Sequence, residues 1–448
     1  MNHPPGPTKG ITLTEARDLQ QDTLGFVLQA AAHYGDLVRY PIGFWQVYLL
    51  NHPDHIQHVF LNNWQNYGRD TFQFNKFSMV TGKGLLTTDG DLWLERRRLV
   101  QPSFHRHKLA GMAERMVQAI GRMVNRWRPT AVQNGIIDID PEMLKLALDI
   151  VGQALFSLDL SAEAGDMSQE MLEMMEYVVY RSQNLLALPE FIPTKRNRRF
   201  TTSLHKFNQW VHSLIQQRRS AHSGHDDLLD LLVQSRYKDG TPLSDDEIRD
   251  ECFTLLIAGY ETVASGMTWI LYLLAQRAEL RAQLRQEVQK VTAGTAPTFD
   301  HLAHFDLLTR TVNESFRLYP PSWLITRQAL QADVIGGYDI PAGALLVVCP
   351  YAIHRHKAFW PEPEQFDPNR FTAETEQTRH KFAYIPFGGG PHLCIGRPFA
   401  LMEAQLTLAT ILLNYDFTLA VTPPIGHKPQ VTIRPEGGVP LQLQTIAE

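Results

Sequence analysis

One cysteine near the C-terminus stands in a setting where its sulfur could react or bind. Cys394 lies in "IPFGGGPHLCIGRPFALMEAQ", between a glycine-rich run and a segment typical of a helix. The glycines at 388, 389, 390 and 396 let the backbone approach another object closely. The first amide groups of the expected helix favour an anion, which lowers the pKa of a nearby thiol and favours its thiolate.

A thiolate beside an open backbone loop suits a soft metal ion in a planar cofactor, and haem iron is the obvious candidate. Two other interpretations of Cys394 stay open at this point: a buried structural cysteine and a nucleophilic cysteine. The remaining cysteines, Cys252 and Cys349, show no paired spacing of a zinc site.

An acid and an alcohol adjoin each other inside an apolar stretch at residues 252–275. The run is Ala258-Gly259-Tyr260-Glu261-Thr262. Glycine costs roughly 1 kcal/mol in a helix interior, and the Thr262 hydroxyl can bond back to the carbonyl of residue 258 or 259. Both features would loosen a long helix beside Glu261 and Thr262. The alternative is a buried helix with a tolerated glycine and a self-satisfied threonine.

Two charged residues share a helix face before Pro320 and Pro321, in "TVNESFRLYPP". Glu314 and Arg317 are three residues apart and therefore adjacent. Such pairs are common on exposed helices and mean little alone. "EQFDPNRF" adds Arg370, in a segment too rich in aromatic residues and proline for a simple solvated loop.

The composition describes the protein that must position these residues. The chain has 448 residues, 44% of them hydrophobic and 20% charged, with a formal net charge of -5. A nucleic-acid partner is not expected, because phosphate binding normally needs a basic excess. Three cysteines are too few to staple a secreted scaffold, and the N-terminus lacks the apolar core of a signal peptide or anchor. We therefore expect a cytoplasmic protein without an integral membrane anchor.

The periodicity of apolar residues indicates a mainly helical chain. Helices are expected at 109–127, 142–156 and 277–291, and a helix of some 30 residues should begin at the capping box formed by Ser244 and Glu247. Residues 252–275 should be buried in a soluble core, because polar residues interrupt their middle. Strands are expected at 36–51, 344–351 and 430–435. The fold class is mainly α with small β-sheets, in one domain over residues 1–448 without a fused reductase.

Five motifs together resemble those of the cytochrome P450 haem-thiolate monooxygenases. The cysteine loop of that family is similar to Phe387-x-x-Gly390-x-His392-x-Cys394-x-Gly396. Its oxygen-activating helix stretch, its Glu-x-x-Arg pair and its arginine segment are similar to residues 258–262, to Glu314 and Arg317, and to "FDPNRF". "WLERRRLVQPSF" is similar to the helix whose Trp93 and Arg97 would meet a haem propionate.

The resemblance implies a triangular, mainly helical fold enclosing haem b, with Cys394 as the proximal iron ligand. It implies propionate contacts from Trp93, Arg97, Arg327 and His392 and a loop shaped by Phe387, Gly390 and Gly396. Glu314, Arg317 and Arg370 would form a buried ion network that fixes the loop. Thr262 would hold water on the distal side and pass protons with Glu261, while O2 is the cosubstrate.

Electrons would come from NAD(P)H through a separate protein, since no dinucleotide fingerprint occurs in the chain. Residues 104–108 and 378–381 with Arg397 would form a basic face for a ferredoxin or a flavodoxin-like donor. The alternative is scattered surface charge. Two histidine clusters, at 52, 55 and 58 and at 354 and 356, are expected to be solvated or capping residues rather than metal ligands.

An apolar, aromatic substrate pocket is expected from the variable segments, with lining residues Phe72, Phe74, Phe77, Ala258, Trp323 and Leu324. Similarity of several stretches to bacterial enzymes of this family suggests hydroxylation of a long hydrophobic molecule. A carotenoid such as β-carotene is the first expectation and a fatty acid the second. The alternatives are a terpenoid, a steroid or a macrolide-like substrate, or a haem-thiolate isomerase or ligand-binding protein, against which Thr262 and Glu261 speak. Peripheral membrane association stays open.

Overall fold

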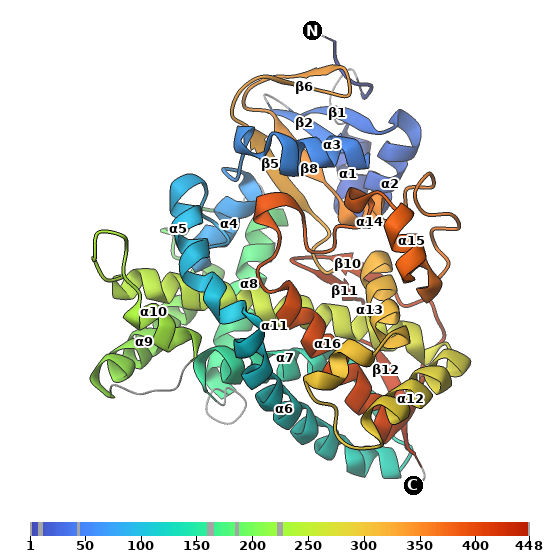
Figure 1. Ribbon diagram of the computed structural model, residues 1–448. Coiled ribbons are helices and arrows are strands. Elements are labelled where there is room, and N and C mark those ends of the chain that lie inside the picture. Colours follow the sequence, from blue (N-terminus) through green and yellow to red (C-terminus); the bar gives the residue numbers. More distant parts are fainter. Residues whose placement is uncertain are drawn as a thin grey trace. The chain divides into compact units, whose positions relative to one another are not determined.

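The computed structural model describes residues 2–7, 12–42, 45–158, 165–183, 188–221 and 227–446. Its helices are α1 (Leu13–Gln21), α2 (Thr23–Tyr34), α3 (Pro53–Gln57), α4 (Phe72–Thr81), α5 (Gly90–Val100), α6 (Arg106–Val132), α7 (Ile139–Phe156), α8 (Gly165–Gln183), α9 (Lys195–Ala221), α10 (Leu228–Gln234), α11 (Asp245–Ala275), α12 (Ala278–Thr292), α13 (Leu307–Leu318), α14 (Pro350–Ile353), α15 (Ala373–Thr378) and α16 (Arg397–Asn414) (Figure 1).

The strands are shorter than the helices. They are β1 (Leu37–Ile42), β2 (Trp45–Leu50), β3 (Tyr67–Gly68), β4 (Ile136–Asp138), β5 (Ile325–Ala329), β6 (Asp333–Ile335), β7 (Tyr338–Ile340), β8 (Leu345–Val348), β9 (Tyr415–Leu419), β10 (His427–Pro429), β11 (Ile433–Pro435) and β12 (Pro440–Thr445). The expected class, mainly helical with small sheets, is confirmed.

The chain divides into two compact units. The first unit comprises Met1–Asn75, Asn313–Cys394 and Pro429–Ile433, and the second comprises Lys76–Val312, Ile395–Lys428 and Arg434–Glu448. The expectation of one domain over residues 1–448 stays a prediction.

The first unit is built on a five-stranded sheet with the order β1-β2-β8-β5-β3. β1 and β2 are antiparallel neighbours, β2 and β8 run parallel, and β5 is antiparallel to β8. The apolar side chains of this sheet pack with α3 and the segment after it, through Tyr48, Ile56, Phe60 and Leu346. Ile385, nine positions before Cys394 in the sequence, belongs to the same core. The loop that carries the cysteine therefore starts from a packed base.

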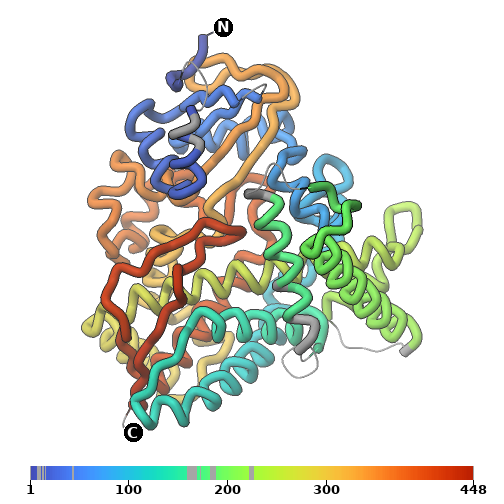
Figure 2. Tube along the Cα trace, turned by 180° about the vertical axis from the view of Figure 1, so that it is seen from behind, coloured from blue at the N-terminus to red at the C-terminus, as the bar shows by residue number. Residues whose placement is uncertain are grey.

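The second unit is a bundle of long helices around α11. A capping box of Ser244 and Glu247 starts α11, as predicted, and the helix runs for 31 residues. α7 packs along α11, α6 packs on α7, and α8 pairs with α9 (Figure 2). The small sheet β4-β12-β9 lies beside α6, and Figure 2 shows its two C-terminal strands in red. The predicted helices at 109–127, 142–156 and 277–291 lie in α6, α7 and α12.

Most of residues 252–275 of α11 are buried in the second unit, as expected. Leu271, Leu274 and Ile270 are fully covered. None of the helices in the described part of the chain is apolar over a stretch long enough to cross a membrane.

Candidate active site

The loop that carries Cys394 is closed by its own backbone. The amide of Gly388 donates to the carbonyl of Ile385 at 3.0 Å, and the amide of Cys394 donates to the carbonyl of Phe387 at 3.0 Å. The Phe387 ring lies 5.9 Å from the Phe316 ring of α13, in an edge-on arrangement. These contacts fix the ends of the loop, and Cys394 itself is exposed.

Gly390 is required in this loop for two reasons. Its φ is +65°, a conformation that side chains rarely adopt, and a Cβ at this position would lie 1.7 Å from the carbonyl oxygen of Phe60. Phe60 lies in the short π-helical segment His58–Asn62. The positive φ and the close approach of the Phe60 backbone together explain the glycine.

Cys394 differs from the other two cysteines in its exposure. Cys252 and Cys349 are buried, and burial raises the pKa of both thiols, whereas Cys394 is exposed. No three His, Cys, Asp or Glu side chains gather as ligands for a bare metal ion among the residues that the structure describes. One accessible soft sulfur fits a metal that brings its other ligands with it, and haem iron is such a metal. The donor chemistry of the loop therefore fits haem.

Glu314 and Arg317 form a fully buried ion pair on α13, within the first unit. The Arg317 guanidinium donates to both Glu314 oxygens, at 2.7 and 2.8 Å, and both side chains are 0% exposed. Arg317 also donates to the carbonyls of His354, Pro363 and Gln365 at 2.6 to 3.1 Å. A bidentate pair with this many backbone partners is a rigid anchor.

Arg370 belongs to the same cluster but contacts it more loosely. Its guanidinium lies 3.6 Å from Glu314 and donates to the carbonyl of Glu362 at 2.9 Å. The amide of Asp367 donates to Glu314 at 2.8 Å. The structure thus brings the three predicted network residues together and adds backbone groups from residues 362–367.

The acid and alcohol of α11 lie on a part of the helix that differs from its surroundings. Ala258 is exposed and Gly259 and Thr262 are half-buried, whereas most neighbouring positions of α11 are buried. The Thr262 hydroxyl donates to the Ala258 carbonyl at 2.7 Å, one of the two bonds expected from the sequence. Another molecule could lie against the helix at Ala258 and Thr262.

The expectation that Gly259 loosens the helix is wrong, because α11 is helical without a break. A Cβ on Gly259 would lie 2.7 Å from a methyl group of Val151 on α7. The glycine therefore allows two helices to pack closely. Next to it, burial raises the pKa of Tyr260, and the charge of Glu261 raises it further.

The helix predicted to meet a propionate, α5, is tied to α11 by a residue that sequence reasoning missed. Arg96 is buried and lies 2.8 Å from Glu247 and 3.6 Å from Glu251, both on α11. Burial raises the pKa of Glu251 to about 7, against the opposing effects of the Leu85 amide and Arg96. A signal in the sequence could have indicated Arg96, since it stands between the predicted site residues Trp93 and Arg97.

The predicted propionate residues are divided between the two units. In the second unit, Trp93 is buried and the Arg97 guanidinium lies 5.6 Å from its ring. In the first unit, Arg327 on β5 is 6% exposed and lies 5.1 Å from the Phe60 ring. His392 lies edge-on to Trp64, with ring centroids 5.7 Å apart.

The candidate substrate residues include both buried and exposed side chains. Phe74 is buried beside Arg327, whereas Phe72 is 48% exposed on the same helix. Trp323 donates its indole N–H to the carbonyl of Gln430 at 2.9 Å. Phe77 and Leu324 are half-buried. Their role in lining a substrate pocket stays a prediction.

The histidines expected to be solvated or capping differ from one another in the structure, and His58 pairs with Asp333 at 2.7 Å. His52 caps α3 as expected, by accepting from the amide of Asp54 at 3.2 Å. His354, by contrast, is 0% exposed and bonded through both ring nitrogens. The expectation fails for His354 because the chain folds back over it between residues 355 and 385, which its sequence neighbours do not reveal.

The predicted basic segments are less basic at the surface than the sequence suggests. Arg379 stacks 4.3 Å from the Trp360 ring, and His380 lies 3.1 Å from Asp54. His105, Arg106 and His107 of the other segment are exposed. Only part of the expected charge is therefore available to a partner.

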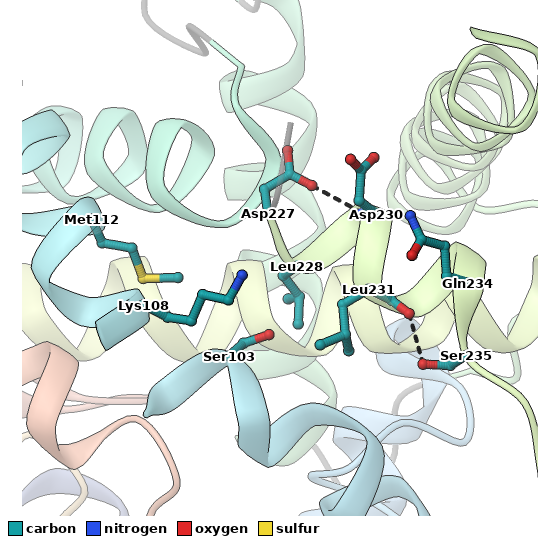
Figure 3. Close-up of a pocket in the computed structure, with 9 residues that line it drawn as sticks. All are labelled: Ser103, Lys108, Met112, Asp227, Leu228, Asp230, Leu231, Gln234 and Ser235. Carbon is teal, nitrogen blue, oxygen red and sulfur yellow. Dashed lines mark hydrogen bonds between the residues drawn. The ribbon is translucent and has the colours of Figure 1, made fainter. Parts of the chain in front are cut away.

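A hollow of about 350 Å³ lies in the second unit, between α10 and the start of α6 (Figure 3). Lys108 and Met112 line one side and Asp227 and Asp230 the other. Both carboxylates are bonded to Arg218, at 2.6 to 3.1 Å. None of the predicted catalytic or cofactor-binding residues lines this hollow.

Comparison with known proteins gives matches over most of the chain. The profile of the family described as Cytochrome P450 matches residues 4–441. Cyclooctatin synthase of Streptomyces melanosporofaciens is 34% identical over 433 residues, 95% of this chain and 92% of that protein. Pentalenene oxygenase of Streptomyces avermitilis is 31% identical over 432 residues, 96% of this chain and 92% of that protein.

A solved structure is similar to this chain over its whole length. The crystal structure of the cytochrome P450DA heme domain matches with a TM-score of 0.90 and 26% identity, over 100% of this chain and 99% of that chain. Membership in the matching family implies a haem-iron cofactor and the use of O2. The chain belongs to the cytochrome P450 family and is a monooxygenase.

Proposed function

We propose that this enzyme inserts one atom of O2 into a C–H bond of a terpenoid-type hydrophobic molecule. The observation that carries the proposal is the accessible thiol of Cys394, held in a closed loop whose lead-in belongs to the same unit as a fully buried ion pair. The names cyclooctatin synthase and pentalenene oxygenase support a terpenoid-type substrate over the carotenoid or fatty acid expected from the sequence. Those two substrate classes stay as alternatives.

Cys394 binds the iron in this proposal. When bound, haem would supply the centre at which O2 is activated, and the Cys394 thiolate would be its electron-rich iron ligand. Gly390 and Gly396 place no side chain beside the sulfur, so that the cofactor can approach the backbone. Phe387 packs the loop against α13. Trp93, Arg97, Arg327 and His392 hold the propionates of haem b.

Thr262 and Glu261 bind water and transfer protons in this proposal. Because the Thr262 hydroxyl donates its proton to the Ala258 carbonyl, its oxygen can accept a hydrogen bond from a water molecule. The buried carboxyl of Glu261 is the next group that can release and regain a proton. A helix that keeps its hydrogen bonds through this region holds both groups in a constant position.

Electrons reach the enzyme from NAD(P)H through a ferredoxin or a flavodoxin-like protein. The exposed cluster of His105, Arg106 and His107 supports an acidic donor. A cytoplasmic location, with or without peripheral membrane contact, remains our prediction.

The experiment is turnover under isotopically labelled oxygen with a surrogate ferredoxin and reductase. The substrates are a set of cyclic terpenoid hydrocarbons, β-carotene and a long-chain fatty acid. We expect one labelled oxygen atom in a hydroxylated terpenoid. A rearranged product without label would contradict monooxygenation and favour the isomerase alternative. Labelled product from β-carotene or the fatty acid alone would contradict the terpenoid class.

A further inference from the structure

His354 connects the buried ion pair to the chain that leads to Cys394. Its Nδ1 lies 3.1 Å from the carbonyl oxygen of Arg317, and its Nε2 lies 2.9 Å from the amide nitrogen of Ile385. A carbonyl only accepts and an amide only donates, so the ring must carry its proton on Nδ1 and leave Nε2 as the acceptor. Both bonds exist together only in this neutral tautomer.

Two hydrogen bonds connect His354 to Arg317. The Arg317 guanidinium donates to the carbonyl of His354 at 3.0 Å, while the His354 ring donates to the carbonyl of Arg317. Arg317 is fixed by Glu314, and all three side chains are 0% exposed. His354 is therefore held by a fully buried, mutually hydrogen-bonded cluster.

On its other side the ring holds the start of the cysteine loop. Ile385 lies outside every helix and strand of the described chain, so its amide is not fixed by a regular ladder. Its carbonyl accepts from Gly388, and two residues further Phe387 accepts from the amide of Cys394. A continuous series of hydrogen bonds thus runs from Glu314 through His354 and Ile385 to the loop.

We propose that His354 is a positioning residue for the iron ligand: its ring couples the Arg317 carbonyl to the Ile385 amide and sets where the loop presents Cys394. This inference rests on the proposed role of Cys394. It assigns no contact between His354 and the cofactor, since the ring acts through Ile385 and the backbone of the loop.

Two amide variants separate the two hydrogen bonds. In His354→Gln the side-chain carbonyl can reach the position of Nε2 and accept from Ile385. In His354→Asn the shorter amide can replace only the Nδ1 donor to Arg317. His356 offers matched controls, because it lies two residues away and contacts Asp36 at 3.0 Å instead. His356→Gln and His356→Asn should behave alike.

The readout is the carbon monoxide spectrum of the reduced, haem-loaded full chain. Loss of one buried hydrogen bond shifts an equilibrium about fivefold or more. We expect His354→Asn, which loses the bond to Ile385, to raise the ratio of unshifted to red-shifted band at least about fivefold over wild type. His354→Gln loses the bond to the Arg317 carbonyl but keeps the one that holds the loop, so it should raise the ratio less. Equal ratios in the two variants would overturn the proposal. A wild type without any red-shifted band would instead overturn the role of Cys394.

A second measurement needs no variant and holds if His354→Asn fails to fold. Amide hydrogen exchange of the wild-type holoenzyme should show the Ile385 amide protected as strongly as amides of the core strands. Exchange at the rate of surface loops would mean that the His354 ring does not hold this amide, and would overturn the inference.

Discussion

The surroundings of Cys394 and the middle of α11 use polar groups in opposite ways. In the first unit, Glu314, Arg317 and His354 are fully buried, and their polar atoms bond mainly to one another and to backbone groups. On α11, Ala258 is exposed and Thr262 is half-buried, with a single hydroxyl bonded to its own helix. The first arrangement fixes the position of the buried side chains beside the cysteine loop. The second leaves one face of α11 accessible.

The difference shows how one fold can separate stability from reactivity. Loss of a buried charge partner leaves the other charge without compensation and destabilises the whole fold. A change on an uncovered helix face removes chemistry at little cost in stability. The following substitutions test this contrast, in order of decreasing effect on the free energy of unfolding.

Glu314→Gln should have the largest effect. It leaves the Arg317 charge buried without a counter-ion, which costs about 3–5 kcal/mol. Asp306→Asn is the matched control at the start of the same helix, because the Asp306–Arg310 pair at 2.8 Å is exposed on the aspartate side. Urea unfolding should show a loss below about 1 kcal/mol for the control. Equal losses would show that the buried pair is not an anchor.

Gly390→Ala should cost about 3 kcal/mol, from the positive φ and from overlap with the Phe60 carbonyl. Gly343→Ala isolates the first cause, since its φ is +79° and a Cβ there would meet nothing within 4 Å. The control should lose roughly 1–2 kcal/mol. Unfolding midpoints and haem content of the two variants give the comparison, and a Gly390→Ala protein as stable as the control would refute the close approach.

Glu251→Gln should change how stability depends on pH. The pKa of Glu251 is about 7 in the folded protein, above its unfolded value of 4.5, so the native state loses stability as the pH rises through this interval. The loss from about pH 5 to about pH 8 is roughly 2–3 kcal/mol for this group. Unfolding free energies across that range should fall less in the variant. Parallel curves for wild type and variant would contradict the raised pKa.

Thr262→Ala should change the free energy of unfolding by less than about 0.5 kcal/mol, because a back-bonded threonine adds little to a helix. Its effect is expected in the chemistry, as less product and more hydrogen peroxide for each NADPH consumed. Thr268→Ala is the control: Thr268 makes the same kind of bond to Ala264 at 2.9 Å but is fully buried. Unchanged product yield in Thr262→Ala would remove Thr262 from the proton path.

Local signals in the sequence predicted much of the fold and part of the site. The capping box at Ser244, the back-bond of Thr262 and the helices α6, α7 and α12 follow from neighbours in sequence. His354 could not be identified in this way, because its partners Arg317 and Ile385 are 37 and 31 residues away. Arg379 was misjudged for the same reason, since only the fold places it against Trp360.

The spectrum of the reduced, carbon monoxide-bound protein tests the central claim most directly. We predict a Soret band strongly displaced to the red, the sign of a thiolate on haem iron, and its loss in Cys394→Ser. Cys349→Ser is the control, because the thiol of Cys349 is buried. An unshifted band in the wild-type protein, or a red-shifted band that survives Cys394→Ser, would contradict the assignment of Cys394 as the iron ligand.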